Sequence, residues 1–221
     1  MGDCPPKLFK EFILSRIPKA DREDTLNAAR QRLLEAAADE FARQGFAGAN
    51  INHISQAAGF SKGTVYNYFP SKQALVLALI AEAGAAHVRY IADQVSQVSD
   101  PIQRLVRFYE AGFRFVEEHP TQARFLITTL YGSGVELQEA LFQAYQPMFH
   151  LVAQDILAPG IQQGLFRRVD LLATTNLLMT VYLGTSSNVD EHGKVFMDPH
   201  QVADFVLHAL QRVNEKISSG G

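Results

Sequence analysis

The stretch GFSKGTVYNYFPSK, at residues 59–72, combines aromatic rings, hydroxyl groups, an amide and two lysines without any acidic side chain. Val65 and Phe69 stand four residues apart, so on a helix they share one face and are expected to pack inward. The other side chains of that helix would then point outward. We predict this outward set to comprise Lys62, Gly63, Thr64, Tyr66, Asn67 and Tyr68.

An outward set of this kind suits the chemistry of double-stranded DNA. Lys62 and Lys72 carry positive charge, and Ser61 with the backbone amides at the start of a helix suits a phosphate oxygen. Thr64 and Asn67 have the groups that meet a thymine methyl and an adenine base edge. Helices joined in this way also occur in proteins that never bind DNA, and tyrosines on a short helix often only pack. The packing interpretation therefore stays open beside the DNA-binding one.

Four helices are needed to position these side chains. A run of apolar residues at helical spacing precedes Gly45, which is typical of a helix end. Asn50 and Ser61 can each cap the helix that follows, and Gly59 provides the turn between those two helices. Pro70 ends the third helix. The predicted helices span residues 25–45, 51–58, 61–69 and 72–95.

The segment RLLEAAADEFARQGFAGANINHISQAAGFSKGTVYNYFPSKQALVLALI, residues 32–80, resembles the N-terminal domain of the TetR family of bacterial transcriptional regulators. The resemblance implies a homodimer in which each subunit presents its recognition helix to successive major grooves of a near-palindromic DNA operator. Lys72 falls where the family grips a phosphate. Ala49 and Asn50 depart from the family, which commonly has threonine or serine there, although Asn50 can still cap a helix. The DNA-contacting residues implied in this way are Asn50, Ser61, Lys62, Gly63, Thr64, Tyr66, Asn67, Tyr68 and Lys72.

The remainder of the chain also reads as helical, over residues 101–118, 120–131, 135–163, 169–187 and 199–216, so the prediction is an all-α fold of about nine helices. In the family that the chain resembles, this larger part binds a small effector. Aromatic and thioether side chains could line an apolar pocket there, although such residues belong to a core more often than to a pocket. The candidate effector-binding residues are Tyr109, Phe113, Phe125, Tyr131, Phe142, Tyr145, Phe149, Met179 and Tyr182.

Two of the later segments suit a subunit interface. The uncharged segment 169–187 and the apolar stripe of 199–216 would form a four-helix interface in a homodimer. We therefore predict three parts: an N-terminal tail at 1–24, a helix-turn-helix DNA-binding domain at 25–71, and an effector-binding and dimerisation domain at 72–217. The basic residues of the tail either follow a phosphate backbone or are simply solvated.

Other classes of function have little support in the sequence. Gly132-Ser133-Gly134 lacks the spacing of a nucleophile elbow, and the seven histidines show no metal-binding spacing, so we expect no enzyme, no metal and no cofactor. Polar residues interrupt the uncharged segment 169–187, which argues against a membrane span. The single cysteine, Cys4, agrees with a cytoplasmic protein. The net charge of −3 combines +2 in residues 1–72 with −5 in the rest.

The sequence thus predicts a cytoplasmic regulator of transcription, most simply a repressor that a small apolar or amphipathic effector releases from its operator. Two alternatives remain: a DNA-binding regulator controlled by a protein partner, and a helical carrier of lipids or drugs. Sequence alone does not identify the effector, the operator or the regulated genes, nor does it separate repression from activation.

Overall fold

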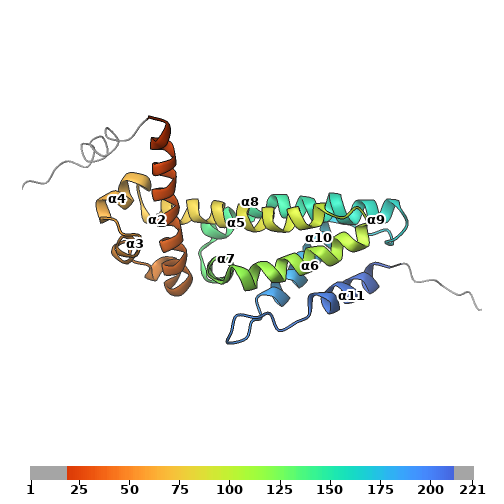
Figure 1. Ribbon diagram of the computed structural model, residues 1–221. Helices are drawn as coiled ribbons and strands as arrows, with labels where there is room; N and C mark the ends of the chain where they lie inside the picture. Colours follow the sequence, from red (N-terminus) through yellow and green to blue (C-terminus); the bar gives the residue numbers. More distant parts are fainter. Residues whose placement is uncertain (1–18, 212–221) are drawn as a thin grey trace, which may run out of the picture. The chain divides into compact units, whose positions relative to one another are not determined.

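The computed structural model describes residues 19–211, with side chains described from Glu23 onward (Figure 1). Within this range the chain forms helices and no strand, apart from one isolated antiparallel bridge between Val189 and Val195. The prediction of an all-α fold is confirmed. Contacts divide the described chain into two compact units: the N-terminal unit (residues 19–83 and 121–141) and the C-terminal unit (residues 84–120 and 142–211).

The N-terminal unit begins with a long helix, α2. This helix starts six residues earlier than predicted, because residues 19–24 contain neither glycine nor proline and nothing interrupts the helical pattern. It breaks at Gly45, whose φ of 65° only glycine adopts easily, so the predicted end of the helix is confirmed. The helices of this unit are α2 (Lys19–Gly48), α3 (Ile51–Ala57), α4 (Lys62–Tyr68), the first part of α5 (Lys72–Ser96), α7 (Pro120–Gly132) and the first turns of α8 (Val135–His150).

Packing holds the two short helices α3 and α4, since helices of seven residues are unstable alone. Ile54 of α3 and Val65 of α4 are fully buried, as is Phe41 of α2. Phe69, just after α4, is also buried, so the predicted inward pair of α4 is confirmed. Phe125 of α7 packs against Phe41, with the two ring centroids 6.3 Å apart. The three-helix unit with its helix-turn-helix is therefore present.

Helix α5 is apolar around much of its circumference and contributes residues to both units. It is the one described helix that is long and apolar enough to span a membrane, yet half of its most apolar stretch is buried inside the protein. Leu75, Val76, Leu79 and Ile80 are among its buried residues. This pattern is typical of the core helix of a folded domain.

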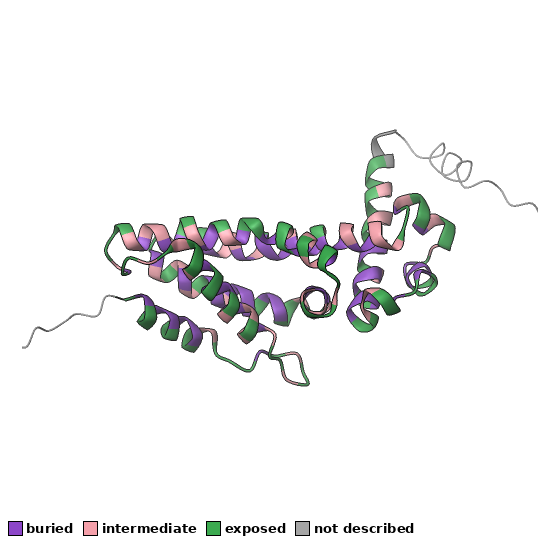
Figure 2. Ribbon diagram, turned by 180° about the vertical axis from the view of Figure 1, so that it is seen from behind, coloured by how far each residue is buried: buried purple, intermediate pink, exposed green. Residues whose placement is uncertain are grey.

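The C-terminal unit is built around α6. This helix packs against α10, α11 and the segment that follows α8. Aspartates cap three of its helices: Asp100, Asp170 and Asp198 each accept a hydrogen bond from a backbone amide of the first turn. Buried residues run along one side of α11 and exposed residues along the other (Figure 2). The helices of this unit are the rest of α5, α6 (Pro101–Glu118), the end of α8 (Val135–His150), η1 (Leu151–Leu157), α9 (Ala158–Gln162), α10 (Leu171–Ser186) and α11 (Pro199–Leu210).

The helix predicted over residues 135–163 is not uniform. It consists of α8, a π-helical stretch η1, and α9. Pro147 and Pro159 both lack an amide hydrogen, so a regular ladder cannot run through the segment, and the wider π turns lie between them. If this continuous segment is counted once, the described residues form nine helices, as predicted. The predicted last helix is observed to Leu210, and the residues after 211 lie outside the described range, as does most of the predicted tail.

The two units do not coincide with the predicted domains. The first half of α5, α7 and the first turns of α8 belong to the N-terminal unit, although the predicted boundary lay at residue 72. The reason is tertiary: Leu75, Val76, Leu79 and Ile80 are buried in the first half of α5, and Phe125 packs on Phe41 of α2. The predicted boundary followed the end of the DNA-binding motif, whereas the unit boundary follows the contacts among buried side chains.

Candidate functional site

Helix α4 presents a polar surface to solvent. Lys62, Gly63, Tyr66 and Asn67 are exposed, while Thr64 and Tyr68 are half-buried. The pKa of the half-buried Tyr68 is raised by burial, so its hydroxyl stays protonated. The structure thus keeps the outward set together on one short helix, in which Val65 is the buried residue. No acidic side chain lies within α4, so the helix has no negative charge that would repel the phosphates along a DNA groove.

Ser61 fixes the start of this helix. Its Oγ accepts a hydrogen bond from the backbone N–H of Thr64 (3.1 Å) and lies 2.9 Å from the hydroxyl of Thr64. This is the predicted N-cap, and it removes one unpaired amide from the first turn. Because α4 has only two turns, the cap directly controls the orientation of the side chains that follow.

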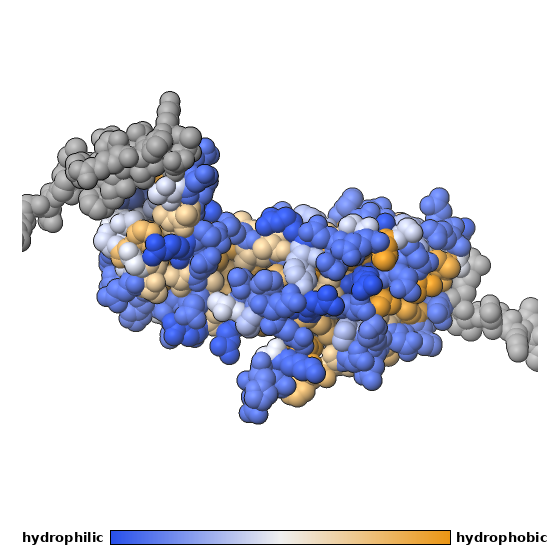
Figure 3. All heavy atoms as spheres, viewed as in Figure 1, coloured by the Kyte–Doolittle hydropathy of each residue, from blue (hydrophilic) through white to orange (hydrophobic). Residues whose placement is uncertain are grey.

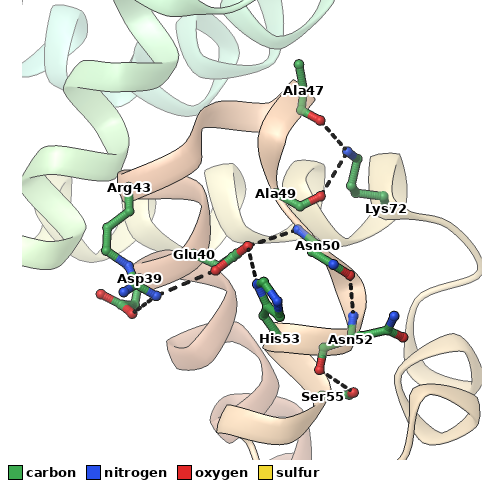
Figure 4. Close-up of polar contacts among 10 residues, drawn as sticks. All are labelled: Asp39, Glu40, Arg43, Ala47, Ala49, Asn50, Asn52, His53, Ser55 and Lys72. Atoms are coloured by element: carbon green, nitrogen blue, oxygen red, sulfur yellow. Dashed lines mark hydrogen bonds and ion pairs between the residues drawn. The ribbon is translucent and has the colours of Figure 1, made fainter.

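Asn50 caps α3, as predicted. Its side-chain oxygen accepts a hydrogen bond from the backbone N–H of Asn52 at 2.9 Å (Figure 4). The backbone N–H of Asn50 in turn donates to Oε1 of Glu40 at 3.0 Å. Asn50 is therefore held from both sides at the junction of α2 and α3.

Glu40 forms a polar network that sequence reasoning missed (Figure 4). Its side chain is only 5% exposed, and Oε1 lies 3.4 Å from Nδ1 of His53, which is largely exposed. Arg43 lies 3.5 Å from the other carboxylate oxygen and 2.9 Å from Asp39. The sequence signal was an acidic residue beside the apolar stripe of α2, where a buried carboxylate requires partners.

Lys72 occupies a different position from the one expected for a simple phosphate contact. Its Nζ donates to the carbonyl oxygens of Ala47 and Ala49, both at 3.2 Å (Figure 4). The same Nζ lies 4.9 Å from the ring centroid of Phe46. The ammonium therefore holds the end of α2 against the start of α5. It has three N–H donors, of which these carbonyls use two.

Arg32 is a second positioning residue that sequence reasoning missed. Its guanidinium donates to the carbonyl oxygen of Ala58 at 2.8 Å and lies over the ring of Phe60. Gly59, with φ of 72°, makes the turn between α3 and α4, as predicted. A Cβ at Gly59 would lie 2.9 Å from Nη2 of Arg32. The turn is thus closed by contact with α2 as well as by its own backbone.

The C-terminal unit contains a buried polar cluster of three residues, His87, Tyr145 and Tyr182. Nδ1 of His87 lies 2.6 Å from the hydroxyl of Tyr145, and Nε2 lies 2.8 Å from the hydroxyl of Tyr182. His87 is 5% exposed and stacks on Phe115, with the centroids 4.1 Å apart. Burial, assisted by repulsion from His119, lowers the pKa of His87 to about 3, so the ring is neutral near pH 7.

Some predicted effector-binding residues do meet around this cluster. The ring of Tyr109 lies 6.4 Å from that of Tyr182 and 6.5 Å from that of Phe113. Met179 is buried on the same helix as Tyr182. Burial raises the pKa of Tyr109, as it does for Tyr145 and Tyr182, so all three hydroxyls stay protonated. His87 was missed, although it is the one polar residue in the apolar run AGAAHV.

Other predicted effector-binding residues lie elsewhere. Phe125 belongs to the core of the N-terminal unit, and Tyr131 of the same unit is 65% exposed. Phe142 is half-exposed and packs on Phe149, with centroids 5.4 Å apart. Helical facing explains the difference, since an aromatic side chain is buried only where its helix turns it inward. In the described part of the chain, no three His, Cys, Asp or Glu residues are placed to hold a metal ion.

The known proteins that this chain resembles are transcriptional regulators. The family model described as bacterial regulatory proteins, tetR family, matches residues 33–79. The transcriptional repressor KstR2 of Mycobacterium tuberculosis is 30% identical over 153 residues, which cover 64% of this chain and 71% of KstR2. The transcriptional repressor NicS of Pseudomonas putida is 27% identical over 178 residues, covering 80% of this chain and 81% of NicS.

Solved structures share the fold. The transcriptional regulator FadR of Bacillus subtilis, solved in complex with stearoyl-CoA, matches with a TM-score of 0.71 and 19% identity, over 82% of this chain and 97% of that one. The structure of KstR2, described as a ketosteroid transcriptional regulator, matches with a TM-score of 0.63 and 22% identity, over 83% of this chain and 95% of that one. The likeness extends through both units.

Proposed function

Because the chain belongs to the TetR family and is therefore a DNA-binding transcriptional regulator, we propose that it represses transcription in the cytoplasm and leaves its operator when a small apolar or amphipathic effector binds. One observation carries the DNA-binding half of this proposal. Helix α4 exposes a polar face free of acidic residues and is fixed by a cap and a buried apolar pair.

The roles of the DNA-contacting residues follow from their positions on α4. Asn67 and Thr64 are assigned to base edges, where an amide pairs with adenine and a threonine methyl packs on thymine. Lys62 and the hydroxyl of Tyr66 are assigned to phosphates, which fix register without reading sequence. Gly63 has no atom other than Ser61 Oγ near its missing side chain, so backbone can approach the groove there.

The remaining predicted contacts support this surface from its edges. Asn50 and Ser61 are assigned to phosphates while they cap their helices, and Tyr68 completes the face of α4. Lys72 is assigned a phosphate contact through the N–H that its two carbonyl partners do not use. Glu40 and Arg32 act as positioning residues, because they hold α3 and the turn against α2.

The functional form is proposed to be a homodimer through α10 and α11. Leu172 and Leu177 of α10 are 73% and 66% exposed, and Phe205 of α11 is 71% exposed. Large apolar side chains gathered at a surface are typical of a protein interface. On the face drawn in Figure 3, apolar residues gather at the end of the C-terminal unit where α11 ends. A two-fold dimer would present two copies of α4 to two half-sites.

The effector is proposed to bind inside the C-terminal unit, beside the aromatic residues that surround His87. Relatives bear names that point to apolar ligands, such as the ketosteroid regulator KstR2 and FadR with stearoyl-CoA. Helices α5 and α8 each contribute residues to both units, so a shift of either helix would reach the N-terminal unit. The effector must bind the released conformation more tightly than the DNA-bound one, or it would regulate nothing.

DNA binding can be tested by fluorescence anisotropy with near-palindromic DNA from the region upstream of the gene. Asn67→Ala should weaken binding about 5- to 150-fold, and Lys62→Ala should lower the salt dependence of log K by about one. The control is Arg168→Ala, an exposed cation of the C-terminal unit, which should bind as the wild type does. Unchanged binding by both N-terminal variants would remove α4 from the interface.

The dimer can be tested by analytical ultracentrifugation. Leu172→Asp and Phe205→Asp introduce charge at exposed positions, so the subunit should still fold but dissociate, and DNA affinity should fall with it. A monomeric wild type would contradict the proposal. DNA binding that no small molecule changes would instead favour control by a protein partner.

A further inference from the structure

Thr175 of α10 is the starting point, because its hydroxyl has no hydrogen-bond partner although the residue is 2% exposed. The hydroxyls of Thr129, Thr180 and Thr185 each donate to the carbonyl four residues earlier, at 2.7 to 2.8 Å. Thr175 could use Leu171 in the same way but does not. A buried hydroxyl without a partner is costly and calls for an explanation.

The cluster of His87, Tyr145 and Tyr182 also has unused hydrogen-bonding capacity. A neutral imidazole has one donor and one acceptor, so its two bonds cannot use both tyrosine hydrogens. Tyr182 has a further partner in Ser186. Among the described residues, Tyr145 bonds only to His87, so its hydroxyl keeps free capacity.

Thr175 and the cluster belong to one interior. Thr175 and Tyr182 are seven residues apart and both buried, so they share a face of α10, about 10 Å apart along its axis. Between them lie Leu178 and Met179, also buried, and the buried hydroxyl of Tyr109 donates to the carbonyl oxygen of Leu178 at 3.5 Å. The groups with unused hydrogen-bonding capacity are thus separated by a mainly apolar stretch, which suits an elongated apolar molecule rather than a small polar one.

This interior offers no counter-charge. The buried polar groups of the described C-terminal unit are His87, Thr175, Ser186 and the hydroxyls of its buried tyrosines, and no Lys, Arg, Asp or Glu is buried there. The single buried charged residue in the described chain is Glu40 of the N-terminal unit. An ionised carboxylate, phosphate or ammonium would lose its hydration without gaining a partner.

We infer that the effector is a neutral, elongated apolar molecule that carries an uncharged oxygen group, such as a hydroxyl or a ketone. That group bonds to the hydroxyl of Thr175, and the Tyr145 end of the cluster makes the second polar contact. A molecule with an ionised head, such as a free fatty acid, binds poorly because the interior cannot neutralise it. This inference rests on the proposed effector-regulated function and specifies the chemistry of its ligand.

The experiment compares probes that differ in charge. Dodecanol, dodecanoate and dodecylammonium share one chain, and a neutral ketosteroid adds a fused-ring body. Isothermal titration of the full-length protein near pH 7 should show binding of at least one neutral probe, and at least tenfold weaker binding of both ions. Equal or tighter binding of dodecanoate would overturn the inference, as would failure of every neutral probe to bind.

Variants separate a ligand contact from a structural role. Thr175→Val removes an unpaired hydroxyl at constant shape, so it should raise the Tm of the ligand-free protein while weakening the neutral probe about five- to tenfold. Thr175→Ser should restore the affinity, and Tyr145→Phe should weaken it. Thr129→Val, at a buried threonine of the N-terminal unit, is the matched control and should leave the affinity unchanged. Undiminished affinity in Thr175→Val would overturn the inference.

The same probes added to the protein–DNA complex distinguish the two proposals. Release of DNA by dodecanoate with no dependence on Thr175 would keep the effector-regulated function and reject the neutral ligand. Binding of a neutral probe that depends on Thr175 but never releases DNA would keep the site and reject the proposed regulation.

Discussion

The two units of this protein differ in where their candidate functional polar residues lie, although both use polar caps and the N-terminal unit buries Glu40. In the N-terminal unit, polar side chains cap helices or bond backbone carbonyls at helix ends, and most remain exposed to solvent, as Ser61, Asn50 and Arg32 do. In the C-terminal unit, His87, Tyr145 and Tyr182 bond to one another in the interior.

This difference matches what each unit is proposed to recognise. A surface that meets DNA exchanges water for phosphate and base contacts, and it can do so while its core stays intact. An interior that meets an effector has to rearrange, because well-packed cores change between discrete arrangements. In the proposed function, the exposed polar residues of α4 contact DNA and the buried polar residues of the C-terminal unit contact the effector.

The largest expected effect on stability comes from removing one large buried side chain from the core of either unit. Phe41→Ala in the N-terminal unit and Phe108→Ala in the C-terminal unit each remove a buried ring, at a cost of about 3–5 kcal/mol in unfolding free energy. Hydrogen exchange should show the loss of protection concentrated in the substituted unit. Equal loss across all described helices in both variants would show that the two units unfold as one.

Overpacking the C-terminal unit should have the next largest effect. A Cβ at Gly112 would lie 2.2 Å from the ring of Tyr182, so Gly112→Ala should cost about 1–3 kcal/mol, measured by urea denaturation. Gly184→Ala is the matched control in α10, where nothing lies within 4 Å. That control should stabilise the protein by about 0.4–1 kcal/mol. A neutral Gly112→Ala would show that Tyr182 moves easily.

The buried histidine should make stability depend on pH. The pKa of His87 is about 3 in the folded protein, against 6.5 for an unperturbed histidine. Between these values only the unfolded chain binds the proton, so the stabilisation is complete above pH 6.5 and is lost as pH falls toward 3. From pH 6.5 to about pH 5 this loss amounts to about 2 kcal/mol.

Urea denaturation at several pH values can isolate this contribution. His87→Gln should lose that part of the pH slope. Tyr145→Phe, which removes a hydrogen bond from the same cluster but keeps the histidine, should retain it. An unchanged slope in His87→Gln would mean that the histidine is not held neutral.

The smallest expected effect concerns the cap of α4. Ser61→Ala removes the acceptor for the N–H of Thr64 and should cost about 1 kcal/mol of unfolding free energy. Ser61→Asn, which retains a capping oxygen, should recover most of it. Circular dichroism during thermal unfolding measures both, and equal stability of the two variants would argue against the cap.

Much of the fold could be predicted from the sequence because its signals are local. Gly45 and Gly59 adopt positive φ where turns were predicted, and α6 spans the predicted residues. Val65 and Phe69 pack inward, as their spacing indicated. The apolar spacing of residues 135–163 predicted one continuous helix. It did not predict that the segment between Pro147 and Pro159 would adopt π-helical turns.

The candidate sites were predictable to different degrees. On α4, one short helix carries the whole outward set, so helical facing was sufficient. Glu40 and Arg32 were missed because their partners lie on α3 and at the following turn. Among the effector-binding candidates, Phe125 and Tyr131 lie in the N-terminal unit, because composition does not reveal which core a helix joins.

The sequence by itself determined the helices, their caps and turns, and the family, because each depends on residues within a few positions of one another. Only the tertiary structure decided which side chains share the interior of the C-terminal unit. His87 meets Tyr145 and Tyr182 across 58 and 95 residues of chain. No local spacing encodes such contacts, since they arise when several amphipathic helices bury their apolar faces together.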